Sequence, residues 1–218
     1  MVEANDARIA IRDELRTLAE SYLARWEEFS DKEYVRTVGD FELTARQTEY
    51  SPGVFLTINK AKVPGLTVDM YIEFRQNGPS KMPLVDPKMS VTPIGDFEGQ
   101  KAAIQHIKMP MMMTNRSIPV VNYRIDEADG SVVVIGSSRG TEQLVADNAA
   151  KIKKDVVGNN IISYVHVAPY DGGCMWTGVQ CMDIAGSIPD MIKRQASDQQ
   201  LKAAERVIQV VLTGKPPK

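Results

Sequence analysis

The chain has 218 residues, of which 43% are hydrophobic and 25% charged, and its formal net charge is −2. This is the balance of an ordinary globular protein with a substantial core, and the near-neutral charge excludes a global electrostatic attraction to nucleic acid or to membranes. No stretch approaches the ~18 apolar residues of a membrane-spanning helix, and the first twelve residues lack the apolar core of a signal peptide. We therefore expect a cytoplasmic protein.

The first predicted element is an amphipathic helix over residues 5–29. Apolar residues recur at spacings of three and four from Ile11 to Phe29, whereas charged residues such as Arg12 and Glu20 lie away from that stripe. The pattern predicts a helix that packs along one side.

The hydrophobic period then changes to two, which predicts strands at 41–50 and 54–63 around a Ser-Pro-Gly turn. Thr67 can cap a short helix that ends near residue 75. The proline-rich stretch 79–93 is expected to be irregular.

The second half of the chain has the same alternating character. We expect further strands at 102–109, 118–127, 131–137, 156–169 and 174–183, with a polar, partly helical insertion between the third and fourth of them. A long terminal helix is expected from Ser187 to about residue 212. Antiparallel strands bracketed by helices predict an α+β fold, and the absence of a linker or repeat predicts a single domain over residues 1–218.

The terminal helix carries a broad apolar face, which includes Ile188, Ile192 and Val207. Such a face must cover another surface, and the natural one is the concave side of a twisted antiparallel sheet. A long sheet wrapped by one helix encloses more volume than side chains readily fill. The space either collapses or holds a ligand.

The sequence carries no recognised catalytic or metal motif. Cys174 and Cys181 lack metal-ligand spacing, and on one strand they would point to opposite faces, so we expect reduced thiols. His106 and His166 are too few for a histidine metal cluster and have no nucleophile signal beside them. Aromatic and basic residues are not interleaved as in nucleic-acid binders. We expect no metal, no cofactor, no catalytic residue and no nucleic-acid partner.

Two segments resemble the START domains, the lipid-transfer domains related to steroidogenic acute regulatory protein. Residues 179–189 form a strand that ends in Asp183, followed by Gly186 and an Ile-Pro pair before the long helix. Upstream, residues 107–117 contain a proline and then Asn115-Arg116 before a strand. The spacing is nearest to that of the phosphatidylcholine-transfer branch.

The resemblance implies a helix-grip fold, in which a twisted antiparallel sheet wraps around the C-terminal helix and leaves an internal cavity. It also implies that the protein binds one lipid, which would be a phospholipid, a sterol or a ceramide-like molecule, and transfers it between membranes. Residues 137–154 would act with the C-terminal helix as a gate.

The resemblance further turns a polar row inward, toward a lipid headgroup. Asn122, Arg124 and Asp126 share one face of a strand. Asn122 stands where relatives commonly carry an arginine that meets the headgroup, which points to a hydroxyl or neutral head. The other expected ligand-binding residues are Tyr164, His166, Trp176, Met182, Met191, Ile192 and Gln195.

Two alternative functions stay open. The chain could be an enzyme of the wider polyketide-cyclase-like group, with His166 as its candidate base, or a lipid-responsive regulator that binds a partner protein. The basic residues of 151–154 could dock transiently on an anionic membrane. We expect a monomer.

Overall fold

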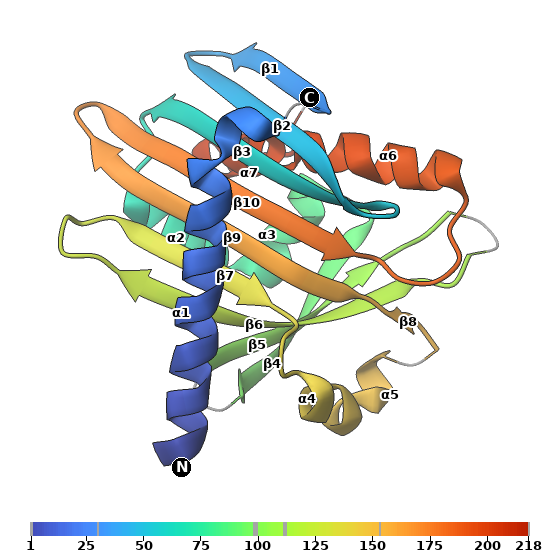
Figure 1. Ribbon diagram of the computed structural model, residues 1–218. Helices are drawn as coiled ribbons and strands as arrows, with labels where there is room; N and C mark the ends of the chain where they lie inside the picture. Colours follow the sequence, from blue (N-terminus) through green and yellow to red (C-terminus); the bar gives the residue numbers. More distant parts are fainter. Residues whose placement is uncertain (1, 30, 98–99, 111–112, 153, 218) are drawn as a thin grey trace.

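The computed structural model describes residues 2–29, 31–97, 100–110, 113–152 and 154–217 (Figure 1). In chain order the strands are β1 Lys32–Val38, β2 Phe41–Ser51, β3 Val54–Pro64, β4 Met89–Phe97, β5 Gln100–Ile107, β6 Arg116–Asp126, β7 Val132–Ser137, β8 Val156–Val157, β9 Asn159–Tyr170 and β10 Gly173–Asp183. The helices are α1 Val2–Ala24, α2 Val68–Gln76, α3 Gly78–Val85, α4 Glu142–Asp147, α5 Ala149–Ile152, α6 Asp190–Leu201 and α7 Ala203–Thr213, with a 3₁₀ turn, η1, at Trp26–Glu28.

All ten strands of the described residues join one sheet in the order β1-β2-β3-β10-β9-β7-β6-β5-β4, with β8 attached to β6. Every pair along this path is antiparallel, and only β8 runs parallel to its neighbour. The prediction of an antiparallel α+β fold with helices at both ends of the chain is confirmed.

Helix α1 crosses one face of the sheet, and the other helices except α4 and α5 lie on the opposite face (Figure 1). On the α1 side, Leu15 and Ala19 pack with Ile135, Ile162 and other residues of the central strands into a filled core. We call this the convex face. On the opposite, concave face, α2, α3 and α7 pack over Leu43, Val63 and Trp176.

Local sequence signals worked well where a turn or a cap carries them. The hairpin of β2 and β3 closes at the predicted Ser-Pro-Gly turn, where Gly53 has a φ of +76° that favours glycine. Thr67 is the cap of α2, and its Oγ1 accepts the N–H of Met70 at 3.2 Å.

Two expectations about proline and helix length were wrong. The stretch 79–93 is not irregular but contains α3 and most of β4. Proline is tolerated at Pro79 because the first helical turn leaves its N–H groups unpaired, and at Pro93 because β4 is an edge strand. The terminal helix is two helices, because the backbone at Lys202 (φ −90°, ψ −3°) interrupts it.

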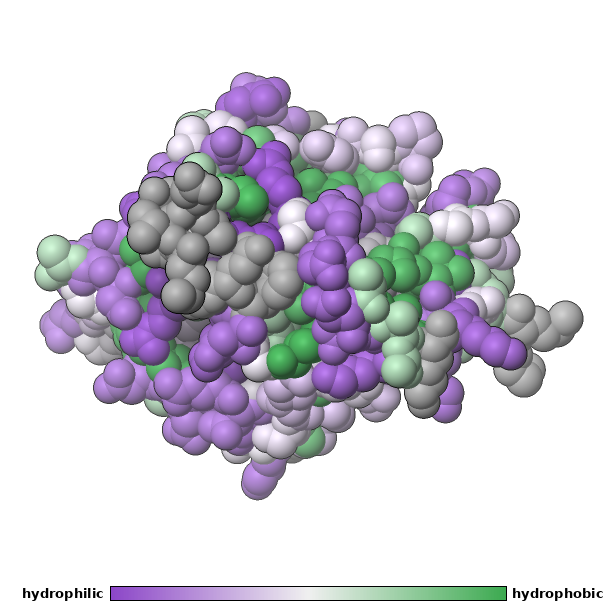
Figure 2. Space-filling model, turned by 90° about the horizontal axis from the view of Figure 1, so that it is seen from below, coloured by the Kyte–Doolittle hydropathy of each residue, from purple (hydrophilic) through white to green (hydrophobic). Residues whose placement is uncertain are grey.

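Among the described residues, no helix is both long and apolar enough to cross a bilayer. From below, hydrophilic residues cover most of the surface, and apolar residues appear in separate areas between them (Figure 2).

Candidate functional site

A cavity of about 1170 Å³ lies between the concave face of the sheet and helices α2, α3 and α6. This exceeds the roughly 300–1,000 Å³ of common small-molecule sites. Its walls come from segments that are far apart in sequence, including β4, β5, β6, β9 and β10. The hydrophobic surface of the sheet is therefore only partly covered by the helices that pack on it.

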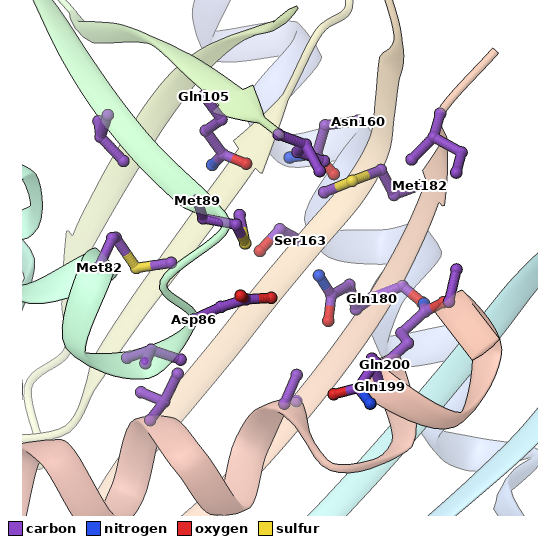
Figure 3. A pocket seen from close by; sticks show the side chains of 18 of the residues that line it. Met82, Asp86, Met89, Gln105, Asn160, Ser163, Gln180, Met182, Gln199 and Gln200 are labelled. Carbon is purple, nitrogen blue, oxygen red and sulfur yellow. The ribbon is translucent and has the colours of Figure 1, made fainter. Parts of the chain in front are cut away.

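Much of the wall is apolar and adaptable. Met82 of α3, Met89 of β4 and Met182 of β10 border the space (Figure 3). Ile192 and Ala196 of α6 also line it. Methionine is unbranched and polarizable, so it can follow ligands of different shape. Such a wall suits a flexible hydrocarbon chain.

A row of polar residues crosses the concave face at right angles to the strands. Asn122 pairs in register with Gly136, Gly136 with Ser163, Ser163 with Gln180, and Gln180 with Thr57. Residues that are directly opposite on neighbouring strands have side chains on the same face of the sheet. These five residues are here called the transverse row. Four of them carry polar side chains on β6, β9, β10 and β3, and Gly136 on β7 has none.

The transverse row continues into a buried network that holds α6 on the sheet. Gln47 of β2 donates from Nε2 to Thr57 Oγ1 at 2.9 Å and to the Ser197 carbonyl at 3.3 Å. Ser197 Oγ donates to Gln47 Oε1 in return. Gln200, one turn on, donates to the carbonyls of Phe55 and Gln180 at 3.1 and 2.9 Å. The polar groups of this end are satisfied by the protein.

The opposite end of the transverse row faces the cavity. Asn122 Oδ1 accepts a hydrogen bond from Arg75 Nη2 of α2 at 2.8 Å. Within the described residues, the side chains of Ser163 and Gln180 make no hydrogen bond. Figure 3 shows Asp86, Ser163 and Gln180 directed toward the same space. This end offers hydrogen-bonding groups that the protein itself does not use.

Beside this end lies an amide that is fully buried. Asn160 of β9 is 0% exposed, and in the part of the chain that the structure describes neither its Nδ2 nor its Oδ1 has a partner. Its direct neighbour across the strands is Met182, which is half-buried and flexible. An unpaired buried polar group costs about 1–3 kcal/mol. The Asn160 amide can therefore accept a partner that the described residues do not supply.

The structure brings most of the predicted site residues to the cavity. Seven of them border it, namely Asn122, Arg124, Tyr164, Trp176, Met182, Ile192 and Gln195. Trp176 is fixed at the wall by its Nε1, which donates to Asn59 Oδ1 at 2.7 Å, and by an edge-to-face contact with Tyr71.

Tyr164 borders the cavity only in part, because its side chain belongs to the convex core beneath α1. Burial raises the pKa of its hydroxyl to about 12. His166 lies on the same convex side, where its Nε2 meets Ser131 Oγ at 3.0 Å, and it does not border the cavity. The inward residues of this strand are Ser163 and Val165, one position out of phase with the prediction.

Two further predicted residues lie outside the cavity. Met191 is 74% exposed on the outer side of α6. Asp126 is exposed at the end of β6 and forms an ion pair with Arg124 at 2.7 Å. Met191 lies on the outer side of its helix, which the sequence could not determine. Asp126 shares the face of Asn122 and Arg124 but lies at the end of the strand, beyond the cavity.

The expected gate segment 137–154 does not line the cavity in its described residues. It lies beside α1 instead, where Arg8 donates to the carbonyl of Gly140 at 2.7 Å and Arg139 pairs with Glu14. Lys153, part of the basic cluster 151–154, lies outside the described residues.

Several cavity residues were missed by the sequence reasoning. Ser163 and Gln180 interrupt apolar strands at inward positions, and this signal was available once the phase of β9 was known. Arg75 and Asp86 had no signal, because only the packing of α2 and α3 brings them to the sheet.

The thiols behave as expected for structural residues. Cys174 belongs to the concave core and Cys181 to the convex core, as the odd spacing predicts. Burial raises the pKa of the Cys181 thiol to about 12, which keeps it protonated and unreactive. Among the described residues, no group of three His, Cys, Asp or Glu side chains could hold a metal ion.

No protein-family model and no curated protein matches the sequence. Solved structures do match. Human STARD10 aligns with a TM-score of 0.63 at 11% identity, covering 88% of this chain and 79% of that one. The human StAR-related lipid transfer protein 5 aligns at 0.60 and 10% identity, covering 93% and 98%. A bacterial STAR-related lipid transfer protein from Xanthomonas axonopodis aligns at 0.58 and 12% identity, covering 84% and 98%.

This chain has the helix-grip fold of the START domains. The predicted fold is confirmed, and it rests on structure alone, because identities of 10–12% carry no information about ligand or mechanism. Within the START fold, this chain places Asn122, Asn160, Ser163 and Gln180 at the cavity wall.

Proposed function

We propose that the protein binds one lipid in the cavity and carries it between membranes. The observation that carries this proposal is a space of about 1170 Å³ with a methionine-rich wall and unused hydrogen-bonding groups in one region. Burial of each CH₂ group stabilises the complex by about 0.8 kcal/mol relative to water. Burial in the cavity can therefore offset the burial that a hydrocarbon chain loses when it leaves a bilayer. The remaining polar groups would orient the head.

Helix α6 is the proposed cover. Its C-terminal half is tied down through Ser197 and Gln200, whereas its N-terminal half begins after a short connection from β10. Arg116, which is 3% exposed, donates to the carbonyls of Ile184 and Ala185 in that connection at 2.9 and 3.2 Å. We call these two hydrogen bonds the Arg116 clamp. Their release would let the start of α6 move outward and admit lipid.

A single domain over residues 1–218, a monomeric state, a cytoplasmic location and transient membrane contact are parts of this proposal. The segment 137–154 is not, because its described residues lie away from the cavity. A carrier needs no catalytic residue, and the enzyme alternative loses its candidate base, since His166 lies on the convex side. The regulator alternative has no specific support from the site.

Native mass spectrometry of freshly purified protein tests the proposal. We expect a complex with one lipid molecule per chain, and transfer of that lipid between two vesicle populations in the presence of protein. A chain that stays free of lipid after incubation with vesicles of mixed phospholipid, sterol and ceramide would contradict it.

A further inference from the structure

We propose that His106, Ser117 and Asp155 form a positioning cluster that holds the start of α6 in place, and that protonation of His106 tightens this hold and slows lipid exchange. This inference rests on the proposed function and adds a control of the same cover. None of the three residues borders the cavity. By the strand period, His106 shares the face of Ala102, which belongs to the convex core.

The hydrogen bonds of this cluster fix the positions of its protons. Ser117 Oγ donates to Asp155 Oδ2 at 2.7 Å, and Ser117 is 0% exposed. Serine has a single hydroxyl proton, so Nδ1 of His106, which lies 2.9 Å from the same oxygen, is the donor of the second hydrogen bond. Nε2 then carries no proton in the neutral ring and accepts from Thr92 Oγ1 at 3.1 Å. Both ring nitrogens are therefore engaged.

The same arrangement accepts a second proton without a change of geometry. A protonated Nε2 can donate to Thr92 Oγ1, because a hydroxyl oxygen is an acceptor as well as a donor. The charged ring would then face Asp155 Oδ2 at 3.7 Å, with 22% of the His106 side chain and 19% of the Asp155 side chain exposed. Solvent screens such a pair less than it screens a surface pair. Imidazole changes its charge between about pH 5 and pH 8, so mild acid strengthens the cluster.

The other charges around the ring are exposed lysines. Lys108 lies just past β5, and its backbone N–H donates to the carbonyl of Lys88 at 2.8 Å. Lys151 and Lys154 lie in and after α5. All four are exposed, so solvent screens their repulsion of a charged ring. Asp155 contacts the ring and is mostly buried, and its attraction therefore outweighs this repulsion.

The cluster also positions β8, which supports the connection from β10 to α6. Asp155 directly precedes β8, and β8 runs beside Arg116 and Ser117. In the connection, a Cβ atom at Gly186 would lie 3.3 Å from Arg116 Nη2 and 3.7 Å from Val156 Cγ1. The connection therefore packs both on the side chain of the Arg116 clamp and on β8. A shift of β8 away from β6 would remove this support.

The residue after β8 adds a second contact with the same region. The N–H of Gly158 donates to the carbonyl of Ser117 at 3.0 Å. A Cβ atom at Gly158 would lie 2.9 Å from the carbonyl oxygen of Asp183, the last residue of β10. This approach is too close for any side chain. A displacement of Asp155 is thus transmitted through three residues of backbone to the end of β10.

The effect of a proton follows from thermodynamic linkage. If α6 opens together with β8, Asp155 moves away from His106 and the attraction between carboxylate and imidazolium is lost. The closed state therefore binds the proton more tightly than the open state, and protonation shifts the population toward the closed state. For a partly exposed ion pair the shift is roughly two- to fivefold.

Lipid exchange at two pH values tests this inference. Donor vesicles of dioleoylphosphatidylcholine carry deuterated phosphatidylcholine, cholesterol and N-palmitoylsphingosine, and mass spectrometry of acceptor vesicles measures what the full chain transfers. We expect the rate to fall roughly two- to fivefold from about pH 8 to about pH 5.5. A rate that is unchanged or higher at the lower pH would overturn the inference. A lack of transfer at both pH values would instead contradict the proposed function.

Histidine variants separate the cluster from a general effect of acid. His106→Asn keeps an amide N–H near the position of Nδ1 but cannot become charged, so its exchange rate should not depend on pH. His166→Gln is the matched control. His166 also bonds a serine, Ser131, through Nε2 at 3.0 Å, but it lies beside the β6–β7 turn, outside the path from Asp155 to the connection. This variant should keep the wild-type pH profile. The reverse pattern would overturn the inference.

A readout without lipid keeps the test independent of transfer. Amide hydrogen exchange of residues 184–192, corrected for its intrinsic dependence on pH, reports the opening of the cover. Protection in the wild-type chain should rise at the lower pH. It should stay constant in His106→Asn and in Asp155→Asn, which removes the carboxylate charge at nearly constant shape. Equal protection of the wild-type chain at both pH values would overturn the inference, whether or not lipid is transferred.

Discussion

The same strands form a filled convex face under α1 and a partly hollow concave face on the other side of the sheet. Under α1 the side chains of Leu15, Ile135 and Ile162 are almost completely buried and leave little free space. On the other side, α6 spans the sheet over a cavity of about 1170 Å³ and contacts it through polar anchors at Ser197 and Gln200. The convex face is therefore filled along α1, whereas the concave face has its own buried core beneath α2 and α7 and stays hollow beneath α6.

The largest expected effect is the loss of packing on the convex face. Leu15→Ala should lower the free energy of unfolding by about 3 kcal/mol, because the deletion leaves a cavity in a filled core. Urea denaturation measures this, and lipid occupancy of the folded fraction should not change. A decrease in the free energy of unfolding of less than about 1 kcal/mol would mean that the convex face is not tightly packed around Leu15.

The second effect is a loss of stability at alkaline pH that also comes from the convex face. The folded state holds the pKa of the Cys181 thiol at about 12, against 9.0 for an unperturbed thiol. The thiol therefore ionises at a lower pH in the unfolded chain than in the folded one. Its contribution to stability is complete below pH 9.0 and is lost as the pH rises toward 12. Tyr164 adds to this loss above pH 10.

The loss due to Cys181 is expected to be on the order of 2 kcal/mol. Cys181→Ala should make the stability less dependent on pH in this range, as followed by chemical denaturation at a series of pH values. An unchanged dependence in the variant would show that this thiol is not responsible.

The third prediction concerns the clamp at the start of α6. Arg116→Lys removes the planar donor group that reaches both carbonyls and should cost about 1–2 kcal/mol. Because the clamp holds the cover of the hollow face, lipid exchange between vesicles should become several times faster. Arg16→Lys on α1, whose ion pair with Glu127 lies on the convex side, is a control that should leave exchange unchanged. Equal exchange rates in both variants would contradict the role of the Arg116 clamp.

The smallest effect on stability is expected at the cavity itself. Ile192→Ala deletes apolar atoms that already face free space, so it should cost less than about 1 kcal/mol. It should nevertheless weaken lipid retention, because the acyl chain loses contacts with α6. A cost equal to that of Leu15→Ala would show that the two faces are packed alike.

Parts of the fold could be predicted from the sequence because the signals for turns, caps and strands are local. The turn at Gly53, the Thr67 cap and the alternating strands each depend on residues a few positions apart. The residues of the candidate site could be predicted from the sequence only in part. Asn122, Trp176 and Met182 border the cavity as expected, whereas Tyr164 borders it only in part and His166 lies on the convex side of β9. In a strand, an error of one residue moves every side chain to the opposite face.

The sequence by itself determined the α+β class, the hairpins β2–β3, β6–β7 and β9–β10, and the presence of an apolar terminal helix that must cover the sheet. Hydrophobic periodicity and turn chemistry encode these features within short windows. Only the tertiary structure decided that Arg75 meets Asn122, that Asn160 has no partner among the described residues, and that the described part of 137–154 lies beside α1. These depend on strand register and helix packing between residues far apart in the chain, which no local pattern specifies.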